Sequence, residues 1–549
     1  MVLWIIHSPP AAFAQKYLFQ PIAYPSTTRG ERHDHKCGFP TILMANSPEN
    51  IDRYQELQLY KLEPTSFDSI YFSPTGHFKI YYSTIGFNAI PLYDRNQNNI
   101  SDYLEFLGMS FDRAWSIEID SLGFNPPPDS SGLPRSVYPV FCRRLSVYGQ
   151  TWLEYEIPQL PEKNYVTYIE INTNFNNIVE YPGITDPIVR DSMAIAVTAA
   201  HEFNHAIQSG YRLWPENNSF YDLWFIESSA TYMEEVVAPE VNDYLQYLED
   251  YFHHTNQPFD YSSNDLSDYG KVVFEIMLGK LYGPQIVREI WTEILHYRAL
   301  PSLENVLSIY GSDLAEEMKR MSSWLYFSGA NSLVGEYFPD SPFFPSLKMM
   351  SGSPIESTET ILIVDSLPRL SFQWYYSENE KERNTTFLLK AGPSSTATEL
   401  YATCVDPFRK TFYQFPASLA FDMPFTLNNL GLPFNVVNTN SQSERYFDFQ
   451  IISRPVESIG SEEMIIYPQP LKLSVNQPFL NFKNVPESAR ITIFNALGKY
   501  VVTLKARDNQ TYLSWDLKTK KGELVGSGVY LYHLHSDRIE KTGKFIIIE

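Results

Sequence analysis

Two histidines and a glutamate stand in an otherwise apolar stretch, AIAVTAAHEFNHAIQSGY, at residues 194–211. Buried ionisable groups are costly unless a partner satisfies them. His201 and His205 are four positions apart, so on a helix they lie about 40° from each other and both imidazoles can reach one cation. The H-E-x-x-H pattern suits zinc, with the glutamate placed to take a proton from a water that the ion activates. We predict Zn²⁺ at His201 and His205 and Glu202 as general base; two satisfied core histidines are the alternative.

A catalytic zinc ion needs a third protein ligand and a vacant fourth position. A second helical pattern, DLWFIESSATYMEEVV, follows at residues 222–237. Its Glu227 stands among apolar and small residues and is expected to face inward. Glu234 and Glu235 compete for the role, but they lie near the end of the pattern and are expected on a solvated face. Glu227 is therefore the predicted third ligand.

HEFNHAIQ followed by WFIESSATYMEE resembles the gluzincin metallopeptidases and, among them, a family of secreted bacterial zinc metalloproteases. The likeness extends over YGKVVFEIMLGKLYG and SSWLYFSG, and so covers roughly residues 37–330. Carried over position by position, it implies that His201, His205 and Glu227 bind zinc and that Glu202 is the base. It also implies a zincin-like α+β fold and a protein or peptide substrate.

The tetrahedral intermediate of amide hydrolysis carries negative charge, so such a site needs a group that stabilises an oxyanion. Tyr269 opens the helical pattern DYGKVVFEIML and resembles a tyrosine near a helix start in related aminopeptidases. A tyrosine that only packs in the core is the alternative.

The strand NYVTYIEINTN at residues 164–174 is the predicted substrate strand. Related enzymes hold an extended peptide against a sheet edge beside the zinc helix. The alternative is that its Thr167 and Glu170 are ordinary exposed strand residues.

DRNQNNISDYLE at residues 94–105 fits an EF-hand calcium loop. The ligand positions of that loop are filled by Asp94, Asn96, Asn98, Ile100 (through its carbonyl), Asp102 and Glu105. Asn99 stands at the turn where glycine is usual, and asparagine tolerates positive φ better than other side chains. We predict one structural Ca²⁺; the alternative is a polar turn that caps the helix after Asp102.

The elements that must position these residues change in kind along the chain. Residues 15–345 mix strand patterns with long helical ones, and helices are expected at 102–122, 187–209, 223–237, 269–282, 284–297 and 303–325. From 350 to 457, short alternating strands separated by turn residues predict an antiparallel sandwich.

A third unit, residues 463–549, has strand alternation with glycines at its turns. YPQP, IFNALGK, SGVYLY and GKF resemble the immunoglobulin-like C-terminal domains of exported bacterial proteins, including type IX secretion sorting domains and the flagellar-hook-cap type. The resemblance implies secretion machinery as a partner; a plain spacer domain is the alternative. The expected fold is thus an α+β zincin-like domain followed by two all-β immunoglobulin-like sandwich domains.

The net charge of −22 over 549 residues argues against nucleic acid as a partner. No apolar run reaches the ~18 residues that span a bilayer. Residues 1–14 read as a signal peptide, truncated at its front, with a small-residue A-x-A site before Gln15. We therefore expect a secreted or cell-surface bacterial protein.

The three cysteines, Cys37, Cys142 and Cys404, cannot form a disulfide framework, although Cys37 with Cys142 is a conceivable pair. Without C-x-x-C spacing, none of them is expected to bind metal.

The sequence thus predicts an exported, zinc-dependent endopeptidase that also carries one calcium ion. A surface-binding or adhesive protein with a structural metal site is the main alternative, and a zinc hydrolase of non-peptide substrates is another. A structural site would show a fourth protein ligand where a catalytic site keeps a vacant position.

Overall fold

The computed structural model describes residues 36–45 and 66–548, with gaps at 158–163, 177, 180, 217–218, 263–265, 334, 382–383, 394, 396–397, 407–409, 418–419, 423–426, 428–430, 443, 456–463, 468–469, 474–478, 484, 487, 507–511 and 537–538. The predicted signal peptide lies outside these residues. Among the helices that are described, none has the length and hydropathy needed to cross a membrane.

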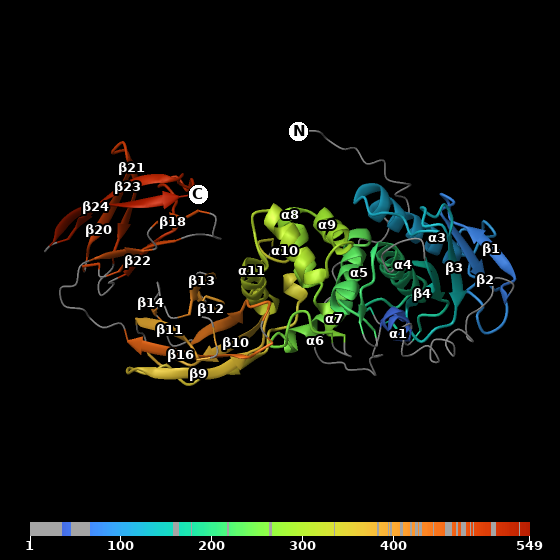
Figure 1. Cartoon of the computed structure of the whole chain (residues 1–549), viewed down its shortest axis with the longest axis horizontal. Helices are drawn as coiled ribbons and strands as arrows, with labels where there is room; N and C mark the ends of the chain where they lie inside the picture. The colour runs from blue at the N-terminus through green and yellow to red at the C-terminus, as the bar shows by residue number, and fades with distance from the viewer. Residues whose placement is uncertain are drawn as a thin grey trace.

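A five-stranded sheet forms one side of the first domain (Figure 1). Its order is β1 (Ser69–Phe72), β2 (Phe78–Tyr82), β3 (Tyr138–Arg143), β5 (Tyr165–Asn172) and β4 (Gly149–Glu156). The pairs β2–β3 and β3–β5 are parallel, and β4 runs antiparallel to β5 at the sheet edge. Every residue of β5 is buried, as expected for an interior strand covered on both faces.

Helix α4 (Pro187–Tyr211) crosses this sheet and carries the H-E-x-x-H pattern. Asp186 caps its first turn by accepting the N–H of Ile188, and proline fits the first helical position that follows. At the other end, the amide of Asn164 donates to the carbonyls of Gly210 and Tyr211. Gly210, expected just after the helix, is therefore part of its last turn.

Two further helices enclose α4. Helix α3 (Asp102–Ala114) continues as a π-helical segment (Trp115–Ser121), and α5 (Leu223–Val237) packs alongside α4. Phe203 of α4 lies 5.2 Å, ring centre to ring centre, from Phe78 of β2 and 5.7 Å from Trp115. This aromatic core fixes the helix against the sheet and so sets where its histidines point.

The remaining elements of the first domain are short. They are α1 (Phe39–Ala45), β6 (Pro215–Glu216), β7 (Ser219–Phe220), a 3₁₀ turn (Asp243–Tyr247), α6 (Leu248–His253), α7 (Ser267–Gly270), α8 (Val273–Tyr282), α9 (Gln285–Ile294), α10 (Ala299–Ile309), α11 (Leu314–Tyr326) and 3₁₀ turns at Gly329–Asn331 and Ser341–Phe343. The prediction of a single helix at residues 303–325 is wrong, because α10 and α11 are separate helices. Gly311, with φ of 75°, breaks it, and Asp313 caps α11 by accepting the N–H of Glu316 at 2.8 Å.

Within its described residues, the regular elements of the second domain are all strands. Its sheets are β13 (Thr411–Pro416), β12 (Leu400–Asp406), β15 (Leu432–Asn438), β10 (Ser371–Ser377) and β8 (Met349–Ser351), and β14 (Ala420–Asp422), β11 (Thr385–Ala391), β16 (Phe447–Pro455) and β9 (Thr360–Leu367). Side chains of both sheets share one core. The boundary near 350 does not separate two cores, because Leu370, Phe372 and Trp374 belong to the apolar cluster of the first domain. The indole of Trp374 donates to the carbonyl of Ser322 on α11 at 3.1 Å.

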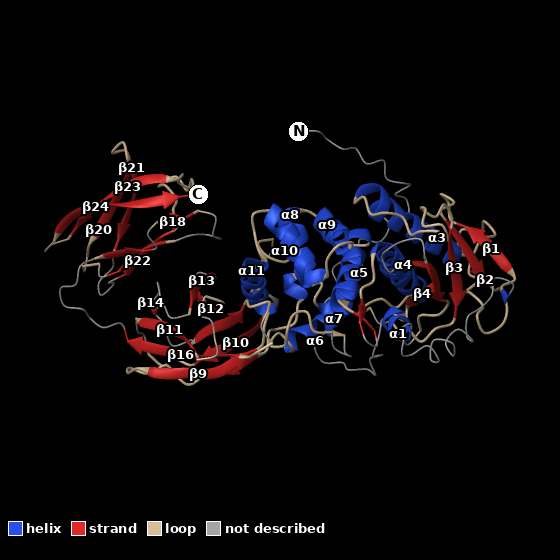
Figure 2. Cartoon of the chain, viewed as in Figure 1, coloured by secondary structure: helices blue, strands red, loops and turns tan. Residues whose placement is uncertain are grey.

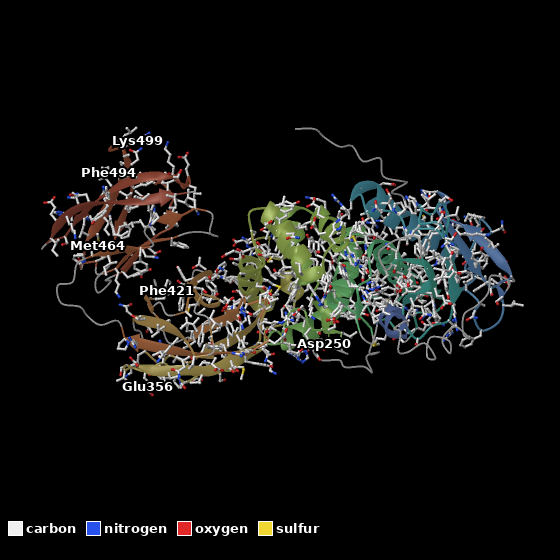
Figure 3. The ribbon with its side chains drawn as sticks, viewed as in Figure 1. Asp250, Glu356, Phe421, Met464, Phe494 and Lys499 are labelled. Atoms are coloured by element: carbon white, nitrogen blue, oxygen red, sulfur yellow. The ribbon has the colours of Figure 1, made fainter. Side chains whose placement is uncertain are left out.

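The third domain has its own apolar core, between the sheets β17 (Ile465–Tyr467), β19 (Leu480–Lys483), β22 (Tyr512–Trp515) and β18 (Leu471–Lys472), β24 (Glu540–Ile548), β23 (Gly528–His535), β20 (Arg490–Asn495), β21 (Tyr500–Lys505). Figure 2 shows the helices between the first sheet and the second domain. Phe421 lies in the second domain and Met464 at the start of the third (Figure 3). The expectation of a mixed helix-and-sheet part followed by separate β-sheets is confirmed.

Candidate metal centre

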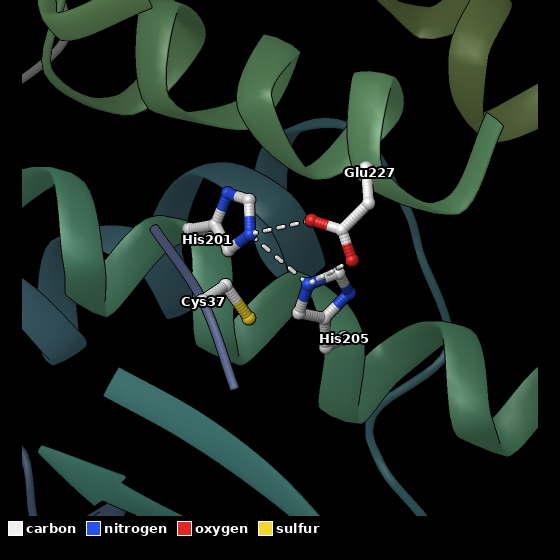
Figure 4. A group of neighbouring side chains, drawn as sticks. All are labelled: Cys37, His201, His205 and Glu227. Atoms are coloured by element: carbon white, nitrogen blue, oxygen red, sulfur yellow. Dashed lines mark hydrogen bonds and ion pairs between the residues drawn. The ribbon is translucent and has the colours of Figure 1, made fainter. Parts of the chain in front are cut away.

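The structure brings the three predicted zinc ligands together (Figure 4). His201 and His205 project from one face of α4, and Glu227 reaches them from α5. The Nε2 atoms of the two imidazoles are 3.0 Å apart. Glu227 Oε2 lies 3.4 Å from Nε2 of His201, and its Oε1 lies 3.4 Å from Nε2 of His205. All three side chains are at most 1% exposed.

These separations match those of ligands around one ion. A tetrahedral zinc ion with bonds of about 2.0–2.1 Å to nitrogen and oxygen requires about 3.3 Å between its ligand atoms. The three measured separations of 3.0, 3.4 and 3.4 Å fall on either side of this value. Two imidazoles with one carboxylate are also a common donor set for zinc. The residues present therefore fit the ion.

The outer nitrogens of both imidazoles are held by hydrogen bonds. His201 Nδ1 lies 2.8 Å from the carboxylate of Glu234, which can only accept. His205 Nδ1 lies 2.8 Å from Oε1 of Gln208, whose amide nitrogen already donates to Asn204 and to the carbonyl of Ile226. Both Nδ1 atoms must then carry a proton, so when both imidazoles are neutral their two Nε2 lone pairs face each other.

Glu227 adds negative charge to these lone pairs. Within the part of the chain that the structure describes, neither of its carboxylate oxygens accepts a hydrogen bond, although both are buried. A buried carboxylate facing two bare nitrogens is satisfied only by a proton or a cation. The arrangement therefore calls for a positive charge at its centre.

The side chains of the cluster shift one another's pKa values. Burial alone would raise the pKa of Glu227, but the imidazoles of His205 and His201 lower it to about 2. Burial alone would lower the pKa of His201, but the carboxylates of Glu227 and Glu234 raise it to about 9. Glu227 is thus an anion at neutral pH, and His201 must lose a proton when a metal ion binds.

Glu202 lies beside the three ligands and is 1% exposed. The hydroxyl of Thr151 on β4 donates to its Oε2 at 2.7 Å and to its backbone carbonyl at 2.9 Å. Gly149, two residues earlier on β4, allows this approach, because a Cβ there would lie 2.9 Å from Cγ of Glu202. Thr151 is a contact that sequence reasoning missed, since no local pattern links it to α4.

The prediction that Glu234 lies on a solvated face is wrong. The Glu234 side chain is fully buried and orients His201. Its other oxygen pairs with Lys36 Nζ at 2.5 Å, and Lys36 also pairs with Asp243 at 2.5 Å. Residues 36 and 243 come from outside α5 and cover the turn where Glu234 lies, which the pattern of α5 alone could not indicate.

Cys37 is the fourth member of the cluster. Its Sγ and the ligand atoms of His201, His205 and Glu227 all lie within 4.8 Å of one another. Cys37, Cys142 and Cys404 are all free and buried, so the pairing of Cys37 with Cys142 is wrong. The expectation that no cysteine binds metal is not tested, but Cys37 lies among potential ligands, which the spacing rule could not indicate because it assumes two cysteines in one loop and this donor comes from a separate segment.

Tyr269 of α7 also reaches this region. Its ring centre lies 6.0 Å from that of His201, and the side chain is 2% exposed. Burial, together with the neighbouring Glu227 and Cys37, raises the pKa of its hydroxyl well above the ordinary value. The hydroxyl therefore stays protonated and is able to donate.

The predicted substrate strand is not at the sheet edge. β5 lies between β3 and β4, so its backbone groups already pair on both sides. Thr167 and Glu170 are buried rather than exposed; the first shares a hydrogen bond with Tyr138 at 2.7 Å, and the second pairs with Arg143 at 3.3 Å. The edge beside α4 is β4, an outcome of strand order that the sequence of β5 does not contain.

Hydrogen bonds join several of the predicted ligands within the predicted calcium loop. Asp94 accepts the N–H groups of Asn98 and Asn99, at 3.2 and 2.8 Å. The side-chain amides of Asn96 and Asn98 donate to the two carboxylate oxygens of Glu105, at 2.9 and 2.8 Å. Asn99 has a φ of 68°, the left-handed conformation that the turn requires.

The other two predicted calcium ligands, Asp102 and Ile100, make hydrogen bonds within the same loop. Asp102 accepts the N–H of Arg95 at 3.2 Å, and Ile100 donates its own N–H to the side chain of Asn98 at 2.9 Å. The following helix is capped by Ser101, which accepts the N–H of Tyr103 at 3.2 Å. Side-chain hydrogen bonds thus connect Asp94, Asn96, Asn98 and Glu105 within the loop, and the calcium ligation of all six predicted residues stays a prediction.

Comparison with known proteins identifies the third domain. Residues 465–549 match the family described as the secretion system C-terminal sorting domain. The protein is therefore secreted or placed at the cell surface by type IX secretion, and its third domain interacts with that machinery. No protein of curated function matches the chain.

Solved structures add only weak likenesses. PorZ, an essential surface component of the type IX secretion system of Porphyromonas gingivalis, is 18% identical with a TM-score of 0.16, over 18% of this chain and 14% of PorZ. The adhesin domain of Epf from Streptococcus pyogenes is 11% identical with a TM-score of 0.13, over 35% of this chain and 79% of that domain. A β-1,2-glucanase from Parabacteroides distasonis is 8% identical with a TM-score of 0.12, over 31% and 29%. At such TM-scores these likenesses carry no argument about function.

Proposed function

We propose that this exported chain is a zinc-dependent metallopeptidase that hydrolyses peptide bonds outside the cell, with His201, His205 and Glu227 as zinc ligands and Glu202 as general base. The observation that carries the proposal is the geometry of the cluster: two converging Nε2 atoms and a buried carboxylate, which accepts no hydrogen bond within the described residues, lie at the separations that one tetrahedral ion requires. A glutamate that does not ligate lies directly beside them.

When bound, zinc supplies Lewis acidity, which polarises a carbonyl and makes a water a nucleophile at neutral pH. Glu202 accepts the proton of that water and returns it to the leaving amine. Thr151 holds one oxygen of Glu202, so the carboxylate keeps its orientation. Tyr269, protonated and buried beside His201, donates a hydrogen bond to the developing oxyanion.

The loop at residues 94–105 has a structural role in this proposal. Calcium prefers oxygen ligands, which Asp94 and Glu105 offer directly and which Asn96 and Asn98 offer once their amides turn. The loop leads into α3, which packs on α4, so the ion would stabilise the helix that carries the zinc ligands.

The substitution Glu202→Gln tests the proposal. Because Cys37 faces the position that a substrate would use, the assay is done in a Cys37→Ser background with a diverse peptide library, with and without chelator. We expect one zinc ion per chain to remain, measured by elemental analysis, and turnover to fall by about 100-fold or more. Glu240→Gln, an exposed carboxylate paired with Arg113, is the matched control and keeps full activity. A Glu202→Gln protein that cleaves as fast as its parent would refute the role.

A second candidate function is a surface-binding protein whose metal is structural. Cys37 favours it, because four protein donors of the kinds that zinc prefers would close the site. In that case a chain with Cys37→Ser would bind zinc more weakly and would hydrolyse no peptide, with or without Glu202.

A further inference from the structure

The segment of residues 36–45, which we call the covering segment, pairs with the edge strand β4 at its first three residues and continues as helix α1. The N–H of Gly38 donates to the carbonyl of Gly149 at 3.0 Å, and the N–H of Tyr148 donates to the carbonyl of Lys36 at 2.9 Å. Cys37 and Gly149 thereby form a parallel bridge. A free sheet edge binds an extended peptide through its backbone groups. The covering segment therefore occupies the edge beside the metal-binding helix.

Side chains fix this segment on both sides of Cys37. Lys36 is 3% exposed and forms ion pairs with Glu234 and Asp243, the first of which also orients His201. Phe39, with no exposed surface, stacks on the ring of His205 with a centre separation of 4.3 Å and an angle of 25°. The segment thus contacts both imidazoles, directly or through Glu234, and its position is coupled to theirs.

The sulfur between these anchors faces the metal centre. A thiolate that completes a tetrahedron with two imidazoles lies about 3.6 Å from their nitrogens, since zinc–sulfur bonds are about 2.3 Å long. The Sγ of Cys37 is within 4.8 Å of every other donor, so a shift of about one ångström reaches that position. Independently, the buried oxygens of Glu227 accept no hydrogen bond in the described chain, so a positive charge, a proton or a cation, is needed between these donors.

We propose that Cys37 is the fourth ligand of the metal ion and that the covering segment keeps the enzyme latent until it leaves the site. The inference rests on the proposed function, because latency has meaning only for a catalytic centre. The thiol gives its proton to solvent as the sulfur–metal bond forms, and it takes a proton back when the bond breaks. Leaving the site frees the fourth position and the edge strand in one movement, so water and an extended peptide gain access together.

Two substitutions separate the thiol from the segment that carries it. Cys37→Ser removes the sulfur and leaves the anchors in place. Gly38→Val keeps the thiol but places a Cβ 2.6 Å from Cβ of Gln150, too close for any rotamer to relieve, so the segment is lifted from β4. Cys404→Ser is the matched control, because it also removes a buried free thiol, in the second domain.

The full-length proteins are loaded with Co²⁺ in place of zinc, and the thiolate-to-cobalt charge-transfer absorption in the near ultraviolet is recorded. Peptidase activity of the zinc forms is measured on a peptide library, and the reactivity of thiols in the native state with a chromogenic disulfide is followed. We expect the absorption in the parent and in Cys404→Ser but not in Cys37→Ser or Gly38→Val. We expect activity to rise by about 10-fold or more in Gly38→Val, since the parent is active only in the fraction of time that it is open, and to rise less in Cys37→Ser, where the fourth position is free but the edge strand stays covered. One additional thiol should react in Gly38→Val.

The outcomes distinguish this proposal from the proposed function. A parent chain that lacks the absorption and cleaves peptides as fast as Cys37→Ser would overturn latency and leave the peptidase intact. Absorption in the parent with no hydrolysis by any variant would overturn latency together with the peptidase and would favour a structural site. A chain that binds neither ion would overturn both.

Discussion

Glu234 joins the candidate metal centre to the segment that covers it, and Glu234→Gln tests that connection. One carboxylate oxygen accepts from His201 Nδ1 at 2.8 Å, and the other pairs with Lys36 Nζ at 2.5 Å. Glutamine has one acceptor and one donor on its amide. It can serve the imidazole or the ammonium group, but its NH₂ then faces the other donor. The substitution therefore removes one of two interactions whichever way the amide turns.

The expected changes in zinc affinity and in folding stability depend on the interactions that His201 and Lys36 keep in the variant. A residue that orients a metal-binding histidine contributes about 10- to 100-fold to metal affinity, or about 1.4–2.7 kcal/mol. Leaving a buried charge without any partner costs about 3–5 kcal/mol of folding stability. The loss in Glu234→Gln should be smaller, because Lys36 keeps its ion pair with Asp243. We therefore expect a folded protein whose zinc affinity is 10- to 100-fold lower.

The measurement is a competition titration of zinc against a chromophoric chelator, with far-ultraviolet circular dichroism of the metal-free protein as a check of folding. Glu240→Gln, whose exposed ion pair with Arg113 contributes little, is the control. A zinc dissociation constant within twofold of the parent, in a protein that is folded, would show that Glu234 does not orient His201 as inferred.

Three other predictions concern pH, calcium and thiols. Burial raises the pKa of Glu275 from 4.5 to about 7, although the hydrogen bond from Ser228 opposes this shift. The contribution of the protonated carboxyl to the free energy of unfolding is therefore complete below pH 4.5 and is lost as the pH rises through 7. Glu275→Gln should remove up to ~3 kcal/mol of this decline in thermal scans, and an unchanged pH profile would contradict the assignment. Calcium at 100 times its dissociation constant should stabilise the folded chain by about 2.7 kcal/mol, which is measured as a higher unfolding temperature. Glu105→Gln should abolish this rise in unfolding temperature, because Glu105 is a predicted ligand. An equal rise in the parent and the variant would place the ion elsewhere. Thiol titration in denaturant with chelator and no reductant should give three thiols per chain, and a count of one would indicate a disulfide.

Local sequence patterns predicted the features that depend only on residues close together in the sequence. His201 and His205 share a helical face because they are four residues apart, and Asn99 adopts positive φ because the calcium-type loop requires it at that position. Helix α5 begins and ends at the predicted residues, since its apolar repeat is long and regular. These features need no knowledge of which segments meet in space.

Contacts between distant segments were decided only by the tertiary structure. Glu234 is buried because Lys36 and Asp243 cover it, and β4 rather than β5 is the edge because of the order in which the strands pair. Cys37 lies among the predicted metal ligands because its segment pairs with β4, far from α4 in sequence. Periodicity tells which side of an element is buried, but it carries no information about which other segment covers that side. The free energy of bringing remote residues together is set by the packing of the whole chain. The sequence could therefore indicate His201, His205 and Glu227 as predicted ligands, but it could not indicate that Cys37 faces them.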